Sequence, residues 1–389
     1  MVPVSYNVRS LLVRKVTTIV TALGIALVVF VFAASRMLTE GVNAAMATSG
    51  RPDTVIVLRK GSDNELSSGL PMDAVAKLRA HPQVSQAAGA GAIGELVQVV
   101  MAPHEGGSGE VSNVTIRGIP EDGIAFRPEV KITSGRAPKP GTNEVVVGKA
   151  IAGRFKGFEI GGTVELRHNR PLSVVGIFDA GGSSYDSEVW CDREFMGQTL
   201  GRTGNVSSVR VRLNSASDFE AYRREIEGTA NKDFAAKVQR EADYYRDQSA
   251  QIGTFLKFIG MFFAIMFSLA AMIGAAITMN AAVAHRSREI GTLRALGFGR
   301  FSILFSFVFE ALLLAVAGGV IGSIAVLGLS FVTFPMMNFQ TFSEIVIRFH
   351  AAPSVFIWSL VFALVMGLIG GLVPAIRASR VSPVEAMRA

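Results

Sequence analysis

Four long apolar stretches constrain the fold of this chain more than any other feature. Each is long enough to cross a bilayer, which takes roughly 20 apolar residues in a helix. Only the third contains a charged residue, Glu310. The first lacks the exit site of a signal peptide and three further stretches follow it, so we interpret it as an anchor. The sequence therefore predicts four membrane spans, formed around residues 16–34, 258–284, 301–335 and 351–376.

The charges are distributed unevenly along the chain. The net charge is +7, but residues 40–250 hold 25 Lys/Arg and 27 Asp/Glu, whereas the rest holds 13 and 4. The basic excess therefore belongs to the apolar part, where it cannot form a broad phosphate-binding face. The basic and aromatic interleaving of nucleic-acid-binding modules is also missing. We expect membrane lipids, and no nucleic acid, as partners.

Basic residues near the span ends predict the orientation, because short cytoplasmic flanks carry an excess of Lys and Arg. One side of the membrane would carry most of them, at Arg9, Arg14, Lys15, Arg286, Arg288, Arg294, Arg300, Arg377, Arg380 and Arg388. The opposite side would carry Arg36, Lys257 and Arg348. Both termini are therefore expected in the cytoplasm. The long insert after the first span and the short 336–350 loop would face outward.

These observations predict an α-helical membrane protein with four transmembrane helices and a large α+β extracytoplasmic domain inserted between helices 1 and 2. An apolar stripe, which consists of Val4, Val8, Leu11 and Leu12, predicts an amphipathic helix before the first span. The expected order is a cytoplasmic amphipathic helix (1–15), first span (16–36), external domain (37–250), stalk and second span (251–284), cytoplasmic helix (285–300), third span (301–335), short external loop (336–350), fourth span (351–376) and cytoplasmic tail (377–389).

The insert alternates strand-like and helix-like runs, which favours an α+β domain of two lobes. Strands are expected at 54–58, 95–101, 111–117, 145–147, 163–167, 172–178 and 206–213, and helices at 72–80 and 217–227. The insert contains little that indicates catalysis. Its histidines lack the spacing of metal ligands, and its one cysteine, Cys191, lacks a signature of a reactive thiol. We predict no catalytic residue and no metal site. The sequence also lacks a phosphate-binding glycine loop, so we expect that this chain does not bind a nucleotide through such a loop.

A short charged helix is predicted between the second and third spans. Ile290, Leu293 and Leu296 recur at helical spacing, and Gly297 is placed to end the helix. A charged surface is supplied by Arg286, Arg288, Glu289 and Arg294. Two interpretations fit these residues equally well: a helix that lies on anionic lipid, and a helix that docks on a protein.

The third predicted span has two further features. Small residues recur along it, at Ala311, Ala315, Gly318, Gly319, Gly322 and Ser323, and such residues let helices approach closely in lipid. They fit packing within one subunit and a seam between two copies equally well. The carboxylate of Glu310 is costly in a bilayer and should face protein or water. We favour a structural link over a proton relay, with Thr278 and Asn280 as candidate partners.

Two C-terminal segments, RSREIGTLRALGFGRFSILFSFVFEALLLAVAGGVIGSI and GLVPAIRASRVSPVEAMRA, resemble the permease domain of the FtsX/MacB superfamily of ABC transporters. Residues 135–178, which read GRAPKPGTNEVVVGKAIAGRFKGFEIGGTVEL and later VVGIF, resemble the MacB-type periplasmic core domain. The order of one span, a large external domain and three spans is similar as well. The chain differs from MacB itself because it has no fused ATPase.

The resemblance implies that residues 285–300 form the coupling helix, which docks on a cytoplasmic ABC ATPase made as a separate polypeptide. ATP and Mg would bind to that ATPase, and this chain would hold no cofactor. The complex would contain two permeases, identical or homologous, and two ATPases, with a periplasmic adaptor as a further candidate partner. ATP-driven motion would reach the external domain by mechanotransmission and export or extract a hydrophobic, lipid- or peptide-like substrate. The alternative is an FtsX-type signalling complex that activates a cell-wall hydrolase without transport.

Overall fold

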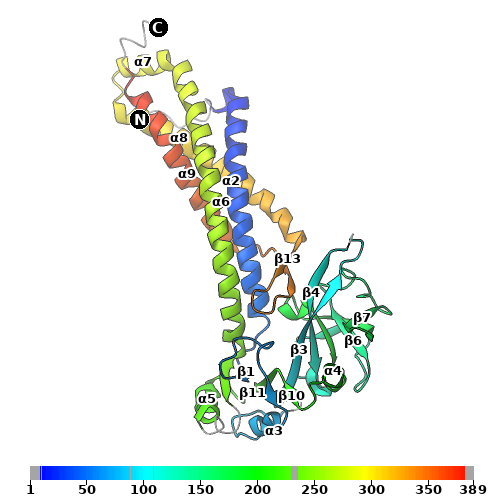
Figure 1. The fold of residues 1–389 in the computed structure, drawn as a ribbon. Coiled ribbons are helices and arrows are strands. Elements are labelled where there is room, and N and C mark those ends of the chain that lie inside the picture. The colour runs from blue at the N-terminus through cyan, green and yellow to red at the C-terminus, as the bar shows by residue number, and fades with distance from the viewer. Residues whose placement is uncertain (1–8, 10, 88, 108, 229–234, 382–389) are drawn as a thin grey trace. The chain divides into compact units, whose positions relative to one another are not determined.

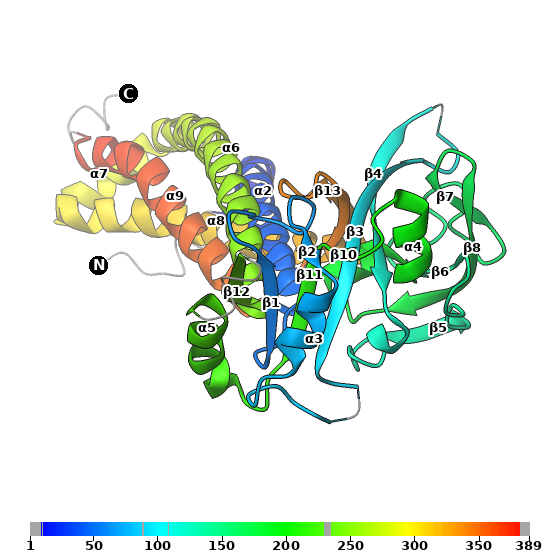
Figure 2. The same cartoon turned by 60° about the horizontal axis from the view of Figure 1, so that its bottom comes forward.

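The computed structural model describes residues 9, 11–87, 89–107, 109–228 and 235–381, and the chain divides into two compact units. We call them the helical unit (Met1–Glu40, Thr254–Val332 and Arg348–Ala389) and the sheet unit (Gly41–Gly253 and Thr333–Ile347). Figure 1 shows the ribbon of both units, and Figure 2 shows the strands and helices of the sheet unit from a second direction.

Four of the described helices are long and apolar enough to cross a membrane. They are α2 (Lys15–Ala47), α6 (Glu241–His285), α8 (Arg300–Val326), which continues into the 3-10 helix η5 (Leu327–Phe331), and α9 (Pro353–Ser379). The predicted fold class is therefore confirmed. Both α2 and α6 extend beyond the predicted spans into the sheet unit, because no proline or glycine pair stops them.

The prediction of the third span was wrong at its end, which was placed at residue 335. The helical backbone stops at Phe331, and Thr333–Met337 form strand β13. Pro335 cannot donate a backbone hydrogen bond, and β-branched residues such as Val332 and Thr333 favour extended backbone. β13 pairs with β14 (Glu344–Arg348), so the predicted external loop is a hairpin of the sheet unit. The predicted helix 1–15 lies mostly outside the described residues, as do Val4 and Val8; residues 11–13 are helical.

The main sheet of the sheet unit has ten described strands in the order β12-β1-β11-β3-β4-β9-β6-β8-β5, with β7 paired to β8. The strands are β1 (Thr54–Arg59), β3 (Ala92–Pro103), β4 (Val111–Ile119), β5 (Lys131–Gly135), β6 (Glu144–Gly148), β7 (Thr163–Arg167), β8 (Arg170–Asp179), β9 (Glu188–Asp192), β11 (Ser208–Arg212) and β12 (Ala236–Arg240). A small separate sheet pairs β2 (Leu70–Pro71) with β10 (Asn205–Val206). The helices are α3 (Asp73–Arg79), α4 (Arg193–Leu200) and α5 (Phe219–Gly228), with 3-10 turns η1 (Glu121–Gly123), η2 (Ser184–Ser187) and η3 (Ala216–Asp218).

The sheet unit has two lobes that share strand β3. Residues 92–95 of β3 pair with β11, and residues 96–103 pair with β4. The apolar core divides in the same place. One cluster, around Val57, Leu78 and Tyr222, lies in the first lobe (β1, β11, β12, α3 and α5), and the other, around Leu96, Phe155 and Val189, lies in the second lobe (β4–β9 and α4).

Side chains complete the backbone hydrogen bonds of β3 where it changes partner. At Gly94, the carbonyl oxygen accepts a hydrogen bond from Arg193 Nη1 at 3.2 Å. At Val97, the N–H donates to Ser207 Oγ at 3.0 Å and the carbonyl oxygen accepts from Arg202 Nη1 at 3.4 Å. The predicted strand at 206–213 is accordingly interrupted at Ser207, between β10 and β11.

Candidate coupling site and buried ionic network

The predicted cytoplasmic helix is present as α7 (Ser287–Ala295), which follows α6 after a single residue. It ends at the predicted place. Gly297 has φ +94°, a left-handed conformation that glycine adopts without a steric penalty. The N–H of Gly297 donates to the Arg294 carbonyl at 3.1 Å and that of Phe298 to the Leu293 carbonyl at 3.1 Å, which satisfies carbonyl groups at the helix end.

Arg286, at the corner between α6 and α7, is buried rather than available to a partner. Its side chain is only 8% exposed. The guanidinium contacts two carboxylates: Nε lies 3.2 Å from Glu289 Oε2 on α7, and Nη1 lies 3.4 Å from Glu310 Oε2 on α8. It also lies over the ring of Phe307, 5.8 Å from the centroid. Arg286 thus joins α7 to the span α8.

Arg294 makes an equivalent connection to the fourth span. Its Nη1 donates to the carbonyl oxygens of Ser379 at 3.3 Å and Val381 at 2.7 Å, at the C-terminal end of α9. A cation at this end of a helix is favoured by the helix dipole. Ile290 adds an apolar contact, because it packs in a cluster with Ile303 and Ala378. α7 is therefore held to α8 and α9 together.

The remaining predicted coupling residues differ in accessibility. Arg288, Glu289 and Gly297 are exposed, whereas Leu293 is half-buried like Arg294. Leu296, just after α7, is an apolar side chain that is 73% exposed. The surface that α7 offers to a partner thus includes two charged side chains, Arg288 and Glu289, and the apolar Leu296.

Glu310 has an ion-pair partner that the sequence did not indicate. We expected Thr278 or Asn280, but the carboxylate is paired with Arg286, and Thr278 Oγ1 lies 3.2 Å from Thr21 Oγ1 instead. The acid lines a cavity of roughly 50 Å³ among the spans, together with Arg14, Thr278 and Gly371. A buried acid paired with a buried arginine supports the structural-link interpretation over a proton relay.

The small residues of α8 contact helices of the same chain. A Cβ atom on Gly318 would lie 2.7 Å from the Ala22 carbonyl oxygen, and one on Gly322 would lie 2.5 Å from that of Ala26, both on α2. Ala311 and Ala315 face glycines of α9, since a Cβ on Gly371 or Gly367 would lie 2.4 Å from their Cβ atoms. Gly319 faces Ala363. These contacts are packing within one subunit; a seam between two copies stays a prediction.

Gly318→Leu is expected to separate α2 from α8, because the new side chain has no space beside the backbone of α2. Overpacking of this kind costs about 1–3 kcal/mol or more. The melting temperature of the full chain in detergent measures the effect. Gly274→Leu is the matched control, since nothing lies within 4 Å of a Cβ at Gly274. Equal melting temperatures for the two variants would contradict the close contact.

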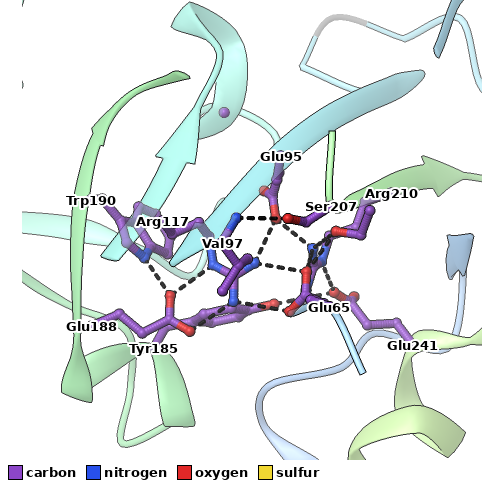
Figure 3. A network of polar contacts seen from close by, with 12 residues as sticks. Glu65, Glu95, Val97, Arg117, Tyr185, Glu188, Trp190, Ser207, Arg210 and Glu241 are labelled. Atoms are coloured by element: carbon purple, nitrogen blue, oxygen red, sulfur yellow. Dashed lines mark hydrogen bonds and ion pairs between the residues drawn. The ribbon is translucent and has the colours of Figure 1, made fainter. Parts of the chain in front are cut away.

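The sheet unit contains a buried ionic network that the sequence analysis missed (Figure 3). Three arginines and four glutamates lie close together at the junction of the lobes, on β3, β4, β9, β11, the start of α6 and two loops: Arg117, Arg127, Arg210, Glu65, Glu95, Glu188 and Glu241. Their side chains are at most 10% exposed.

Arg117 lies at the centre of this network. It binds Glu188 through two bonds, Nε to Oε2 and Nη2 to Oε1, each 2.7 Å long. On its other side, Nη1 lies 3.0 Å from Glu65 Oε1 and 2.9 Å from Glu95 Oε2 (Figure 3). Glu188 belongs to the second lobe, Glu65 to the first, and Glu95 to the point where β3 changes partner. Arg117 therefore connects the two lobes.

Arg210 connects the same carboxylates to α6. Its Nη1 lies 2.9 Å from Glu65 Oε1 and also pairs with Glu95. Its Nε lies 2.7 Å from Oε1 of Glu241, the first residue of α6, where the helix dipole favours a negative charge. Tyr185 donates to the same oxygen at 3.2 Å. The first turn of α6 is thus fixed to the junction of the lobes.

The arginines of the network keep two of its carboxylates, Glu65 and Glu95, ionised. Burial opposes the charge of Glu65, but Arg117 and Arg210 outweigh it and hold the pKa of this carboxyl well below its usual range. For Glu95, burial is likewise outweighed by Arg127, Arg210 and Arg117, and the pKa is lowered. Burial raises the pKa of Tyr185 to about 12, so its hydroxyl stays a donor. Glu65 and Glu95 therefore remain charged at neutral pH opposite the buried arginines.

The cysteine and the two histidines discussed next are not among the seven residues of the network. Cys191 lies buried in β9, where burial raises the pKa of its thiol, and a thiol of this kind is a poor nucleophile. His81 and His104 pair with glutamates: Nδ1 of His81 lies 3.1 Å from Glu225, and Nε2 of His104 lies 3.6 Å from Glu344. Among the residues that the structure describes, no group of three or more His, Cys, Asp or Glu could hold a metal ion.

Two family descriptions match most of the chain. Residues 16–229 match the MacB-like periplasmic core domain, and residues 261–383 match the FtsX-like permease C-terminal region. The chain therefore belongs to the MacB/FtsX family of ABC transporter permeases. It is a membrane protein with an extracellular domain, and its family implies a cytoplasmic ATPase as partner.

Individual proteins that are similar to this chain are named as ABC transporter permeases or as MacB. The chain is 25% identical over 409 residues to the uncharacterized ABC transporter permease YknZ of Bacillus subtilis, with 97% of this chain and 96% of YknZ covered. It is 30% identical over 253 residues to the macrolide export ATP-binding/permease protein MacB of Azoarcus sp., which covers 62% of this chain and 37% of that protein. The crystal structure of the extracellular domain of YknZ is similar over 48% of this chain and 99% of that domain, with 20% identity and a TM-score of 0.37.

Proposed function

We propose that the chain is the transmembrane subunit of a MacB-like transporter, driven by an ATPase on a separate polypeptide. The observation that carries this proposal is the corner at Arg286. A charged helix, α7, exposes Arg288, Glu289 and Leu296, while Arg286 and Arg294 hold it to α8 and α9. A partner that displaces α7 would therefore displace two spans with it.

Continuity of α6 supports transmission to the outer side. This single helix of 45 residues begins at Glu241 in the ionic network and ends at His285, next to Arg286. At 1.5 Å per residue it is about 68 Å long. We infer that ATP-driven movement of α7 changes the external domain by mechanotransmission. That change would export or extract a hydrophobic, lipid- or peptide-like substrate.

The assembly that this function requires has two permeases, identical or homologous, and two ATPases, which bind the ATP and Mg. The termini and α7 would lie in the cytoplasm, and the sheet unit would lie outside the bacterial inner membrane. If the complex is an exporter, a periplasmic adaptor would be a further partner. This chain would itself catalyse no reaction.

Charge reversals on α7 test the docking surface. Glu289→Lys and Arg288→Glu are each expected to reduce recruitment of the ATPase, since losing one desolvated partner at an interface costs about 2–5 kcal/mol. The measurement is pull-down of the ATPase and its ATP turnover in membranes with equal permease levels. Glu220→Lys, on the exposed face of α5, is the matched control.

The alternative, a helix that only rests on anionic lipid, makes the opposite prediction for Glu289. A lysine there would spare or improve membrane association. Full recruitment of the ATPase and normal turnover in Glu289→Lys would therefore contradict docking through this residue. In that case the family assignment would stand and the contact with the ATPase would lie elsewhere.

The match of residues 261–383 to the FtsX-like region is equally compatible with a second candidate function. In that case the external domain would activate a cell-wall hydrolase, and nothing would be transported. The genes beside the permease gene separate the two: an adaptor gene favours transport, and a peptidoglycan hydrolase gene favours signalling.

A further inference from the structure

The β13–β14 hairpin, residues 333–347, has an apolar surface that is exposed and two polar side chains that are buried. Asn338 and Glu344 are both buried: Asn338 Nδ2 donates to Gln248 Oε1 at 3.1 Å, and Glu344 Oε1 accepts from Arg154 Nη2 at 2.7 Å. The rest of the sheet unit thus holds the hairpin through a hydrogen bond and an ion pair, and also through the buried side chains of Ile345 and Ile347.

The outward surface of the hairpin is apolar and aromatic. Phe334, Met337, Phe339 and Phe342 are 44%, 53%, 43% and 60% exposed. Within residues 333–347 the only charged residue is the buried Glu344. Arg348, the last residue of β14, is charged and exposed at the end of the hairpin that leads to the fourth span. In water, a surface of this kind costs free energy in proportion to its apolar area. Its composition therefore fits an apolar environment.

Phe342 shows that the exposure of these rings is built into the backbone. It has φ +52°, a conformation that is rare for an aromatic residue and is kept only where neighbouring groups enforce it. Its N–H donates to the Asn338 carbonyl at 2.8 Å, and its carbonyl accepts from Asn113 Nδ2 at 2.8 Å. Both bonds fix the backbone of the hairpin tip while the ring stays outside.

Short connections join the hairpin to the third and fourth spans. β13 begins at Thr333, two residues after the helical backbone of the third span ends at Phe331. β14 ends at Arg348, five residues before α9 begins at Pro353. An extended residue covers at most about 3.6 Å, so these connections reach no further than roughly 7 Å and 18 Å. Both ends of the hairpin are covalently held near the ends of membrane spans.

We propose that the hairpin is an interfacial anchor that inserts Met337, Phe339 and Phe342 into the lipid of the adjacent leaflet. Apolar side chains of interfacial elements enter about 5–10 Å into the boundary between headgroups and acyl chains. The hairpin thereby ties the sheet unit to the membrane surface. This role is independent of whether the protein transports a substrate or signals.

The test places an environment-sensitive dye on the hairpin. Met337→Cys and Phe342→Cys, each labelled with the fluorophore NBD, are reconstituted in phosphatidylcholine–phosphatidylglycerol vesicles with and without doxyl-labelled lipid. We expect blue-shifted emission that the doxyl lipid quenches severalfold. Ala221→Cys, on the exposed face of α5, is the control and should be unaffected. The unmodified chain shows whether the buried Cys191 takes up dye.

Two results would overturn the proposal. One is emission at both positions that matches Ala221→Cys, which would mean that the surface stays in water. The other is unquenched emission together with disulfide-linked dimers of Phe342→Cys, which would mean that a second copy covers the surface. The melting temperature of each labelled variant establishes that the compared proteins are folded.

Discussion

Replacing Arg117 with methionine is expected to lower the free energy of unfolding of the sheet unit by about 3–5 kcal/mol. Removal of one partner from a buried ionic network leaves uncompensated charge in a medium that solvates it poorly. Here the carboxylates of Glu188, Glu65 and Glu95 would each lose a contact of 3.0 Å or less. The loss in stability should appear as a lower melting midpoint, by about 6–20 °C for a domain of this size.

Fluorescence of Trp190 measures this midpoint directly. Trp190 is buried beside the network and donates to Glu188 Oε2 at 2.8 Å. In a Trp358→Phe background it is the only tryptophan of the chain. Arg136→Met is the matched control, because Arg136 forms a two-bonded pair with Glu144 that is exposed to solvent. If both variants melt at the wild-type temperature, the network does not stabilise the sheet unit.

Arg286→Met is expected to have the largest effect on the helical unit. It removes the ion pair with Glu310, which leaves a buried carboxylate without this partner, at a cost of about 3–5 kcal/mol. It also separates α7 from α8, so ATP turnover should lose its dependence on substrate. Thermal melting in detergent and ATPase assays with the reconstituted partner measure the two effects.

The double variant Arg286→Met/Glu310→Met distinguishes a specific pair from general damage. Replacing both members of a buried pair with apolar side chains is often neutral, whereas losing one is not. We therefore expect the double variant to melt well above Arg286→Met alone. Losses that simply add would mean that the two residues act independently.

Hydropathy alone predicts the spans and most strands, because each has a period or a length that a single segment reveals. The strand predicted at 163–167 coincides with β7, and that at 54–58 lies within β1. β5 was missed because four of its five residues are exposed and show no apolar alternation. β9 was missed because it begins with a buried glutamate, Glu188.

The ion pairs could not be predicted from the sequence because they join residues far apart in the chain. Arg117 and Glu65 are 52 residues apart, and Arg210 and Glu65 are 145 apart. A local signal did exist. Arg210 lies between two valines in one predicted strand, and Glu95 begins another. A charged side chain in an apolar strand lies either at an exposed edge of the sheet or in a buried ion pair. Similarly, the isolated acid Glu310 indicated a partner, but 24 residues separate it from Arg286.

The partner change in β3 has a mechanical consequence. Among the described strands, β3 alone carries the backbone ladder from one lobe to the other. A rotation of the lobes about this strand would break none of the hydrogen bonds within either half of the sheet. The ion pairs of Arg117 and Arg210 cross this point, so they would resist such a rotation where the backbone ladder does not. If the external domain moves in the cycle that we propose, the two lobes would turn against each other only once these ion pairs separate.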